Sequence, residues 1–186
     1  MDTQNLILTL TFLLAVIAIF WRTTDPRPGK EVFKDYFSSK TLFILLCTWA
    51  FVGLSILSGL YFPLNFYGLD QLVVILGVIS FASGFILCIW AKITMKHNWG
   101  VPAKLDKKRQ KELITKGPFK FTRNPIYLGM SLLYIGYALS LRSTFSFLAI
   151  VPLYYFWTSA IKEEEILEKE FGEKYLQYKS KVPFLL

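Results

Sequence analysis

The chain of 186 residues is 54% hydrophobic and only 18% charged, with a mean hydropathy of +0.43. A soluble domain of this length cannot bury so much apolar surface in one core. The composition therefore excludes a soluble globular protein and predicts helices that face lipid. The net charge of +8 does not indicate nucleic-acid binding, because the basic residues are segregated along the chain in a way that favours anionic lipid headgroups as partners.

Five apolar segments predict an all-α integral membrane protein with about five transmembrane helices in a single domain of residues 1–186. A helix needs about 20 apolar residues to cross the hydrocarbon layer. Two of the segments reach that length, and three shorter ones carry no Asp, Glu, Lys or His before their last turn. In chain order, the predicted spans are residues 6–21, 41–62, 69–91, 126–141 and 145–161.

The distribution of basic residues predicts the orientation in the membrane. Of 21 Lys and Arg residues, five lie in residues 22–40, ten in residues 92–123 and five after residue 161. Cytoplasmic loops retain positive charge during insertion. We therefore expect the N-terminus outside and the C-terminal tail in the cytoplasm.

Two polar segments, residues 92–125 and 162–186, are expected to meet at one membrane surface. The turn between the last two predicted spans, residues 142–144, is so short that these spans should form an antiparallel helical hairpin. One polar segment directly precedes this hairpin and the other directly follows it. The two segments are therefore predicted to lie together at the cytoplasmic face.

The first candidate for chemistry is the stretch before the fourth span, where aromatic residues, a charge and an amide crowd together in residues 117–127. Arg123 is a candidate catalytic or ligand-binding residue, but a cation at this position also fits the positive-inside pattern. Asn124 followed by Pro125 is typical of a helix N-cap followed by the first helical position. The sequence leaves open whether Asn124 contacts a ligand or only caps the helix.

The second candidate is Glu163-Glu164-Glu165, three carboxylates at the cytoplasmic end of the fifth span. Ionisable groups near the bilayer are costly, and they usually pair with a cation or serve a site. The alternative is a solvated helical turn, in which Glu165 pairs with Lys169 at i,i+4 spacing. This alternative accounts for only one or two of the three carboxylates.

A third candidate follows the third span. His97 is the only histidine, and it is a candidate general base because its side chain titrates near neutral pH. An amphipathic anchor beside Trp99 is the simpler interpretation. No metal site is predicted, since Cys47 and Cys88 lie inside apolar segments and no CxxC pair exists.

Four apolar residues of the tail recur at helical spacing and predict one packed face. Gly172 interrupts this pattern and predicts a break or a close approach. The four residues are Leu167, Phe171, Tyr175 and Tyr178.

The order of these motifs strongly resembles the isoprenylcysteine carboxyl methyltransferase family. The similarity comprises residues 113–129, a helical hairpin, the three glutamates, and Phe171-Gly172-x-x-Tyr175-x-x-Tyr178, and it covers roughly residues 92–183. Related membrane methyltransferases, including phospholipid N-methyltransferases, share the pattern. The resemblance implies an S-adenosylmethionine site at the membrane surface, built from the segment before the fourth span and the start of the tail.

The resemblance also implies roles for particular residues. Asn98 and Trp99 are expected beside the opening for the substrate, and Arg123 is expected near the carboxylate of the cofactor. The residues implied to bind the cofactor are Leu113, Ile114, Phe119, Arg123, Asn124, Tyr127, Glu163 and Glu164.

Phe119 stands where the family usually has a tyrosine, and two further departures bear on the substrate: Asn124 replaces a histidine, and Ser159 replaces an arginine suited to a substrate carboxylate. The nominal activity is methylation of the carboxylate of an isoprenylated cysteine. The departures make N- or S-methylation of a phospholipid or small amphiphile the alternative. A non-catalytic lipid-binding or interaction protein is the alternative of another class.

Overall fold

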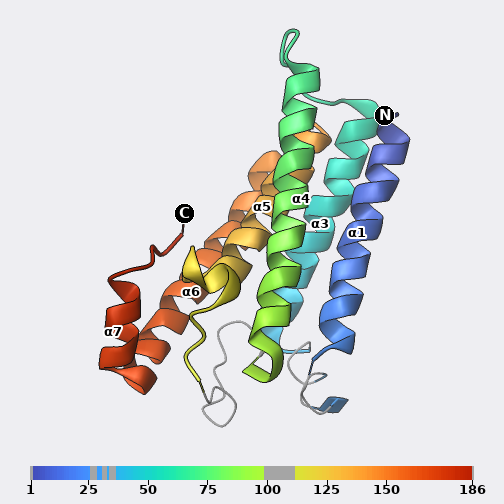
Figure 1. Cartoon of the computed structure of the whole chain (residues 1–186). Coiled ribbons are helices and arrows are strands. Elements are labelled where there is room, and N and C mark those ends of the chain that lie inside the picture. Colours follow the sequence, from blue (N-terminus) through green and yellow to red (C-terminus); the bar gives the residue numbers. More distant parts are fainter. Residues whose placement is uncertain (1, 26–28, 31–32, 34–36, 99–111, 186) are drawn as a thin grey trace.

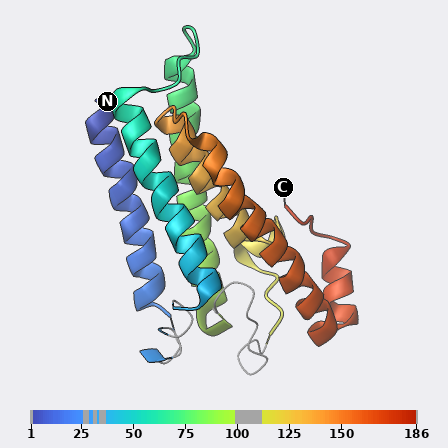
Figure 2. The same ribbon diagram turned by 180° about the vertical axis from the view of Figure 1, so that it is seen from behind.

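The computed structural model of the protein describes residues 2–25, 29–30, 33, 37–98 and 112–185, and this part of the chain is helical without strands (Figure 1). Helices α1, α3 and α4 stand side by side, whereas α6 leans away from them towards its C-terminal end, where α7 lies beside it (Figures 1 and 2). The α-helices are α1 (Thr3–Thr23), α3 (Ser39–Tyr61), α4 (Asp70–Met95), α5 (Pro125–Ser140), α6 (Ile150–Phe171) and α7 (Glu173–Lys179).

Three of these helices are long and apolar enough to cross a membrane: α1, residues Thr41–Tyr61 of α3, and α4. Their bounds agree with the first three predicted spans to within a few residues. Helix α5 coincides with the fourth predicted span, and it is apolar but only 16 residues long. The total of five spans, the single domain and the orientation remain predictions.

At two places a helix continues past the end of the predicted span, because helical hydrogen bonding does not stop where the sequence becomes charged. Helix α4 extends to Met95, so Lys92, the first residue of the predicted polar segment, is helical and buried. The fifth predicted span begins with the short 3₁₀ helix η3 (Ser146–Ala149), and α6 then continues through the three glutamates to Phe171. Helix α6 therefore carries these glutamates on a rigid element.

The predicted hairpin and the predicted break in the tail are both confirmed. Helices α5 and α6 run antiparallel on either side of a short turn (Figure 2). At this turn Arg142 forms a 2.7 Å ion pair with Asp70. Arg142 is the one basic residue of the sequence that lies outside the three basic segments, and this pair gives it a structural role. At the other end, Gly172 adopts a left-handed φ of 50° and separates α6 from α7.

Helices α4 and α5 pack against each other through glycines. A methyl group on Gly84 of α4 would lie 2.5 Å from the carbonyl oxygen of Gly129 and 2.8 Å from the backbone nitrogen of Leu133, both on α5. Gly77 on α4 and Gly136 on α5 are equally close to the opposite backbone. Small residues let membrane helices approach until their backbones touch. The antiparallel seam therefore fixes the end of α4 beside the start of α5.

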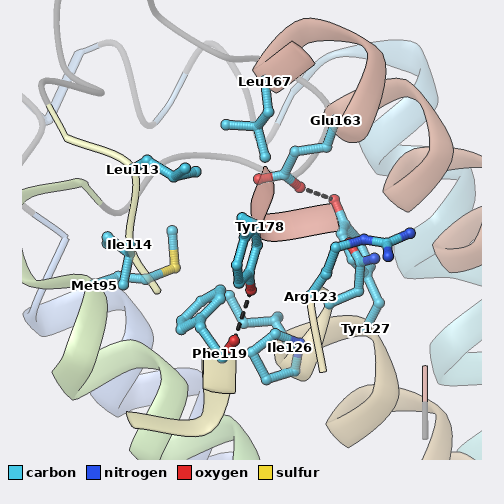
Figure 3. A pocket seen from close by; sticks show the side chains of 12 residues that line it. Met95, Leu113, Ile114, Phe119, Arg123, Ile126, Tyr127, Glu163, Leu167 and Tyr178 are labelled. Carbon is cyan, nitrogen blue, oxygen red and sulfur yellow. Dashed lines mark hydrogen bonds between the residues drawn. The ribbon is translucent and has the colours of Figure 1, made fainter. Parts of the chain in front are cut away.

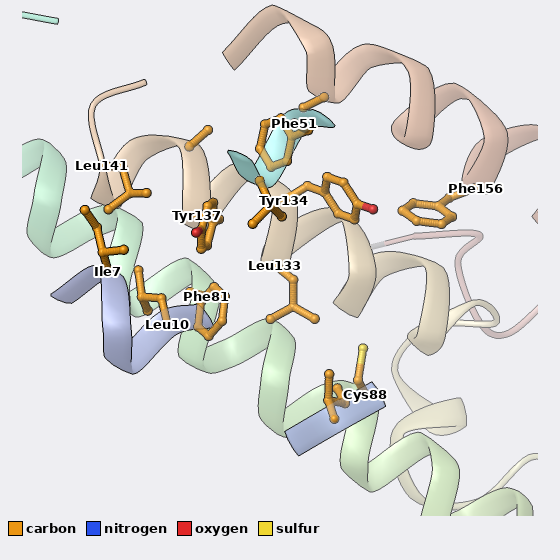
Figure 4. Close-up of a cluster of buried hydrophobic side chains, with 14 of the residues drawn as sticks. Ile7, Leu10, Phe51, Phe81, Cys88, Leu133, Tyr134, Tyr137, Leu141 and Phe156 are labelled. Carbon is orange, nitrogen blue, oxygen red and sulfur yellow. The ribbon is translucent and has the colours of Figure 1, made fainter. Parts of the chain in front are cut away.

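Aromatic side chains fill the interior between α3, α4, α5 and α6 (Figure 4). The rings of Phe51 and Tyr134 lie 5.2 Å apart, and those of Tyr134 and Phe156 lie 5.6 Å apart. The hydroxyl groups find partners, since Tyr137 is 3.0 Å from Thr11 and Tyr134 is 2.5 Å from Thr48. Pairing of this kind is needed where water is absent.

We expect Gly84→Ala to destabilise the protein, because the added methyl group meets backbone atoms that cannot move aside. Overpacking of this kind typically costs about 1–3 kcal/mol. The matched control is Gly53→Ala in α3, where nothing lies within 4 Å of an added methyl group. Thermal unfolding in detergent should show a lower midpoint for Gly84→Ala and an unchanged or higher one for Gly53→Ala. Equal midpoints would contradict the seam.

Candidate cofactor site

A pocket lies where the end of α4, the start of α5, the second half of α6 and α7 converge (Figure 3). Its cavity volume is about 40 Å³, and the surrounding free space, which includes open solvent, is about 490 Å³. The two segments that the sequence predicts to meet do meet here. Seven of the eight predicted cofactor-binding residues line the pocket: Leu113, Ile114, Phe119, Arg123, Asn124, Tyr127 and Glu163.

A glycine turn places one wall of this pocket. Gly117 has a φ of 61°, and a methyl group there would lie 2.6 Å from Oγ1 of Thr94 on α4. The turn leads into the short helix η2 (Gly117–Lys120), which carries the buried ring of Phe119. The Tyr178 hydroxyl donates a 2.7 Å hydrogen bond to the Phe119 carbonyl oxygen, so α7 is tied to the same wall.

Glu163 provides a carboxylate in the pocket. The Tyr127 hydroxyl donates a 2.9 Å hydrogen bond to its Oε2 atom (Figure 3). Burial raises the pKa of Glu163, and the negative charge of Glu164 adds to this effect, while the hydrogen bond from Tyr127 opposes it. The pocket thus contains a carboxylate that attracts cations and hydrogen-bond donors but titrates above the ordinary carboxyl range.

Glu164, the eighth predicted residue, is not among the lining residues and instead pairs with Arg123. The guanidinium Nε and Nη2 atoms donate to Oε1 and Oε2 of Glu164 at 2.7 and 3.0 Å. The two side chains are only 10% and 9% exposed. A buried carboxylate needs such a bidentate partner, because desolvation of an unpaired charge is expensive.

The rest of the Arg123 guanidinium faces the C-terminal tail. Its Nη1 atom donates to the carbonyl oxygens of Lys179 and Val182 at 3.1 and 2.6 Å. The Arg123 backbone N–H donates to the Pro183 carbonyl oxygen at 3.0 Å. Arg123 therefore borders the pocket while its donors bind Glu164 and the tail.

The helix-cap interpretation of the Asn124 side chain was wrong. Asn124 does occupy the N-cap position of α5, but its side chain makes no capping hydrogen bond. Its Nδ2 atom donates to Oε1 of Glu164 at 3.0 Å and to the Phe184 carbonyl oxygen at 3.1 Å. These two bonds orient the amide through its nitrogen, and its oxygen, the atom that would accept from a helix N–H, makes no capping bond.

The predicted substrate residues are only partly described. His97 and Asn98 lie in the short helix η1 (Lys96–Asn98), directly after α4. Asn98 is half-buried and does not line the pocket. The His97 side chain and Trp99 lie outside what the structure describes. Ser159 is buried on α6, four residues before Glu163.

Five pocket residues were not predicted from the sequence as site residues. Leu167 and Tyr178 belong to the apolar face of the tail, so their periodicity was a usable signal. Pro125 and Ile126 lie within the candidate stretch 117–127 but were given no role in ligand binding, and Met95 is brought to the pocket by the packing of α4 against α5.

Comparison with known proteins identifies the family. The sequence profile described as phospholipid methyltransferase matches residues 72–174, more than half of the chain, which include nearly all of α4, all of α5 and α6, and the first two residues of α7. The chain therefore belongs to the phospholipid methyltransferase family, whose members are membrane methyltransferases that use S-adenosylmethionine. The resemblance found in the sequence is confirmed at this level.

Two curated relatives share part of the chain. Protein-S-isoprenylcysteine O-methyltransferase of Xenopus laevis is 31% identical over 111 residues, which cover 59% of this chain and 38% of the relative. Methanethiol S-methyltransferase 1 of Bradyrhizobium diazoefficiens is 32% identical over 68 residues, which cover 37% of this chain and 24% of the relative. The chain thus matches well under half the length of either relative. No solved structure matches the chain.

We expect Arg123→Gln to destabilise the protein strongly, since it removes the bidentate partner of the buried Glu164 carboxylate and leaves the more distant Lys179 ammonium, 3.9 Å from Oε2, as its remaining cation among the described residues. Removing one partner of a buried pair typically costs about 3–5 kcal/mol. Arg142→Gln is the matched control, because its pair with Asp70 lies at the other end of the bundle and is more exposed. The measurement is thermal unfolding of both variants. A loss for Arg123→Gln no greater than for Arg142→Gln would mean that the buried pair is not a structural constraint.

Proposed function

We propose that the chain is a methyltransferase that transfers a methyl group from S-adenosylmethionine to a lipophilic acceptor, and that the pocket around Glu163 binds the cofactor. The observation that carries this proposal is the Glu163 carboxylate, held by Tyr127 in a pocket whose other walls are mainly apolar and aromatic. A carboxylate in such surroundings is suited to a cationic ligand that has a large apolar part.

The residues of the pocket fit this cofactor. S-Adenosylmethionine combines a sulfonium cation and an amino group with an adenosyl group, and when bound it supplies an electrophilic methyl group. Glu163 would hold a cationic or hydroxyl group of the cofactor, and the faces of Phe119 and Tyr178 would attract the cation or stack on the base. Leu113 and Ile114 would provide apolar and backbone contacts.

The contribution of the protein to the reaction would be mainly placement and exclusion of water. Methyl transfer from a sulfonium to an anionic acceptor neutralises charge, whereas a neutral amine or thiol takes over the positive charge and then loses a proton to solvent. In either case a preorganised site with little water can supply much of the rate enhancement. The tight α4–α5 seam and the aromatic interior close the pocket on the side of the helix bundle. Arg123, Asn124 and Glu164 would hold the polar side of its wall through their hydrogen-bond network.

The acceptor is nominally the carboxylate of an isoprenylated cysteine. The contacts of Arg123 favour the alternative acceptor, an amine or thiol of a phospholipid or small amphiphile. Within the described residues, Arg123 is the one cation that lines the pocket, and its guanidinium already binds Glu164 and two tail carbonyls. A carboxylate acceptor needs a cation that is free to bind it. An amine or thiol does not, and so N- or S-methylation of a phospholipid or small amphiphile is the preferred reaction.

Calorimetry with the detergent-purified protein tests the proposal, together with transfer of a labelled methyl group to farnesylcysteine, phosphatidylethanolamine and an alkanethiol. We expect binding of S-adenosylmethionine, and label on the amine or the thiol. Label on farnesylcysteine alone would restore the carboxylate acceptor. No binding of S-adenosylmethionine or its demethylated product would favour a non-catalytic lipid-binding protein.

The raised pKa of Glu163 predicts a pH dependence of cofactor binding. Above this pKa the carboxylate is ionised and attracts the cationic cofactor, so affinity falls as pH is lowered through it, beginning above the ordinary carboxyl range. Calorimetry across this pH range should show the fall in the unmodified protein and a weaker, flatter profile in Glu163→Gln. The exposed neighbour provides the control Glu165→Gln, which should keep the fall. The same profile in all three proteins would exclude Glu163 as the responsible group.

A further inference from the structure

The segment formed by residues 180–185 is attached to the pocket wall by its own backbone. The Val182 and Pro183 carbonyl oxygens accept hydrogen bonds from the side chain and the backbone of Arg123, respectively. The Phe184 carbonyl oxygen accepts from Thr122 Oγ1 and from Asn124 Nδ2, both at 3.1 Å. Three consecutive residues before α5 thus bind three consecutive carbonyls of the segment.

The same donors hold Glu164 on α6. Arg123 donates to the segment through Nη1 and to Glu164 through Nε and Nη2. Asn124 divides its donors in the same way, because its single amide nitrogen has two N–H groups and faces one acceptor from each element. Asn124 is only 6% exposed, so water cannot easily replace either acceptor. Docking of residues 180–185 and the position of Glu164 therefore depend on each other.

This network borders the pocket on two sides. On α6, Glu164 directly follows Glu163, the carboxylate of the pocket, in the sequence, and on α7 the ring of Tyr178 lines the pocket just before the segment begins. The ring of Phe184 packs 4.9 Å from that of Trp157 on the outer side of α6. Displacing the segment would separate Phe184 from Trp157 and remove one of the two acceptors of Asn124. It would also free the chain that directly follows Tyr178.

We infer that Asn124 is a positioning residue, which couples docking of residues 180–185 to the shape of the pocket and so to cofactor affinity. This inference rests on the proposed cofactor site. An amide fits the role because it is neutral and offers two protons on one nitrogen to two acceptors. A carboxylate of the same shape offers none and adds a second negative charge beside Glu164.

Coupling is reciprocal, so the inference can be tested from both ends. Trypsin cleavage after the exposed Lys181 reports undocking of the segment, and calorimetry with S-adenosylhomocysteine reports the pocket. In the full chain, we expect saturating S-adenosylhomocysteine to slow this cleavage. Asn124→Asp should speed cleavage and weaken S-adenosylhomocysteine binding about tenfold.

The matched control is Asn65→Asp, at the opposite end of the bundle. Asn65 acts there only as an acceptor, through Oδ1, for the Tyr67 N–H, and a carboxylate keeps that bond. Phe184→Ala weakens docking of residues 180–185 directly and leaves Asn124 intact. It therefore tests the coupling even if Asn124→Asp does not fold. It should weaken S-adenosylhomocysteine binding and raise the KM for S-adenosylmethionine while kcat at saturating cofactor is unchanged. A merely structural role would lower kcat through loss of folded protein.

The outcomes separate this inference from the proposed function. Binding of S-adenosylhomocysteine to the unmodified protein, with equal affinity in Asn124→Asp and Phe184→Ala, would overturn the coupling and leave the cofactor site standing. Cleavage at Lys181 that ignores bound S-adenosylhomocysteine would do the same. Absence of binding to the unmodified protein would overturn the proposed cofactor site, and the coupling with it.

Discussion

The buried ion pair between Arg123 and Glu164 is the interaction on which the polar end of the molecule depends. A carboxylate that is 9% exposed is tolerated on α6 chiefly because a guanidinium binds both of its oxygens, with further support from the Asn124 amide and the Lys179 ammonium. Arg123 comes from the segment before α5 and also binds the carbonyls of the tail, so one side chain joins three parts of the chain. With Glu164 held in this way, Glu163 is the glutamate that faces the pocket.

A second constraint, the glycine seam between α4 and α5, fixes the apolar end of the same pocket. Because Gly84 and Gly129 bring the two backbones into contact, Met95 at the end of α4 and Tyr127 at the start of α5 have little freedom to move apart. The pocket therefore lies between the close α4–α5 backbone contact and the hydrogen-bonded network of Arg123, Asn124 and Glu164. Such an arrangement would supply the preorganisation that the proposed methyl transfer requires.

Hydropathy and charge were enough to predict the first three long helices, the hairpin and the meeting of two distant polar segments. They could not separate Glu163 from Glu164, because neighbours on a helix point about 100° apart and only tertiary contacts decide which one faces the pocket. The role of Asn124 was hidden for a similar reason, since Asn-Pro has the same appearance whether or not the side chain caps the helix. The continuation of α6 past the charged boundary also depends on its packing against the tail.

The central claim is that a cofactor binds between Phe119, Tyr127, Glu163 and Tyr178. An experimental structure of the protein with S-adenosylhomocysteine tests it most directly. The account predicts ligand density in this pocket, within hydrogen-bonding distance of Glu163 and in contact with the Phe119 or Tyr178 ring. Density at another site, with this pocket filled by protein side chains, would contradict it.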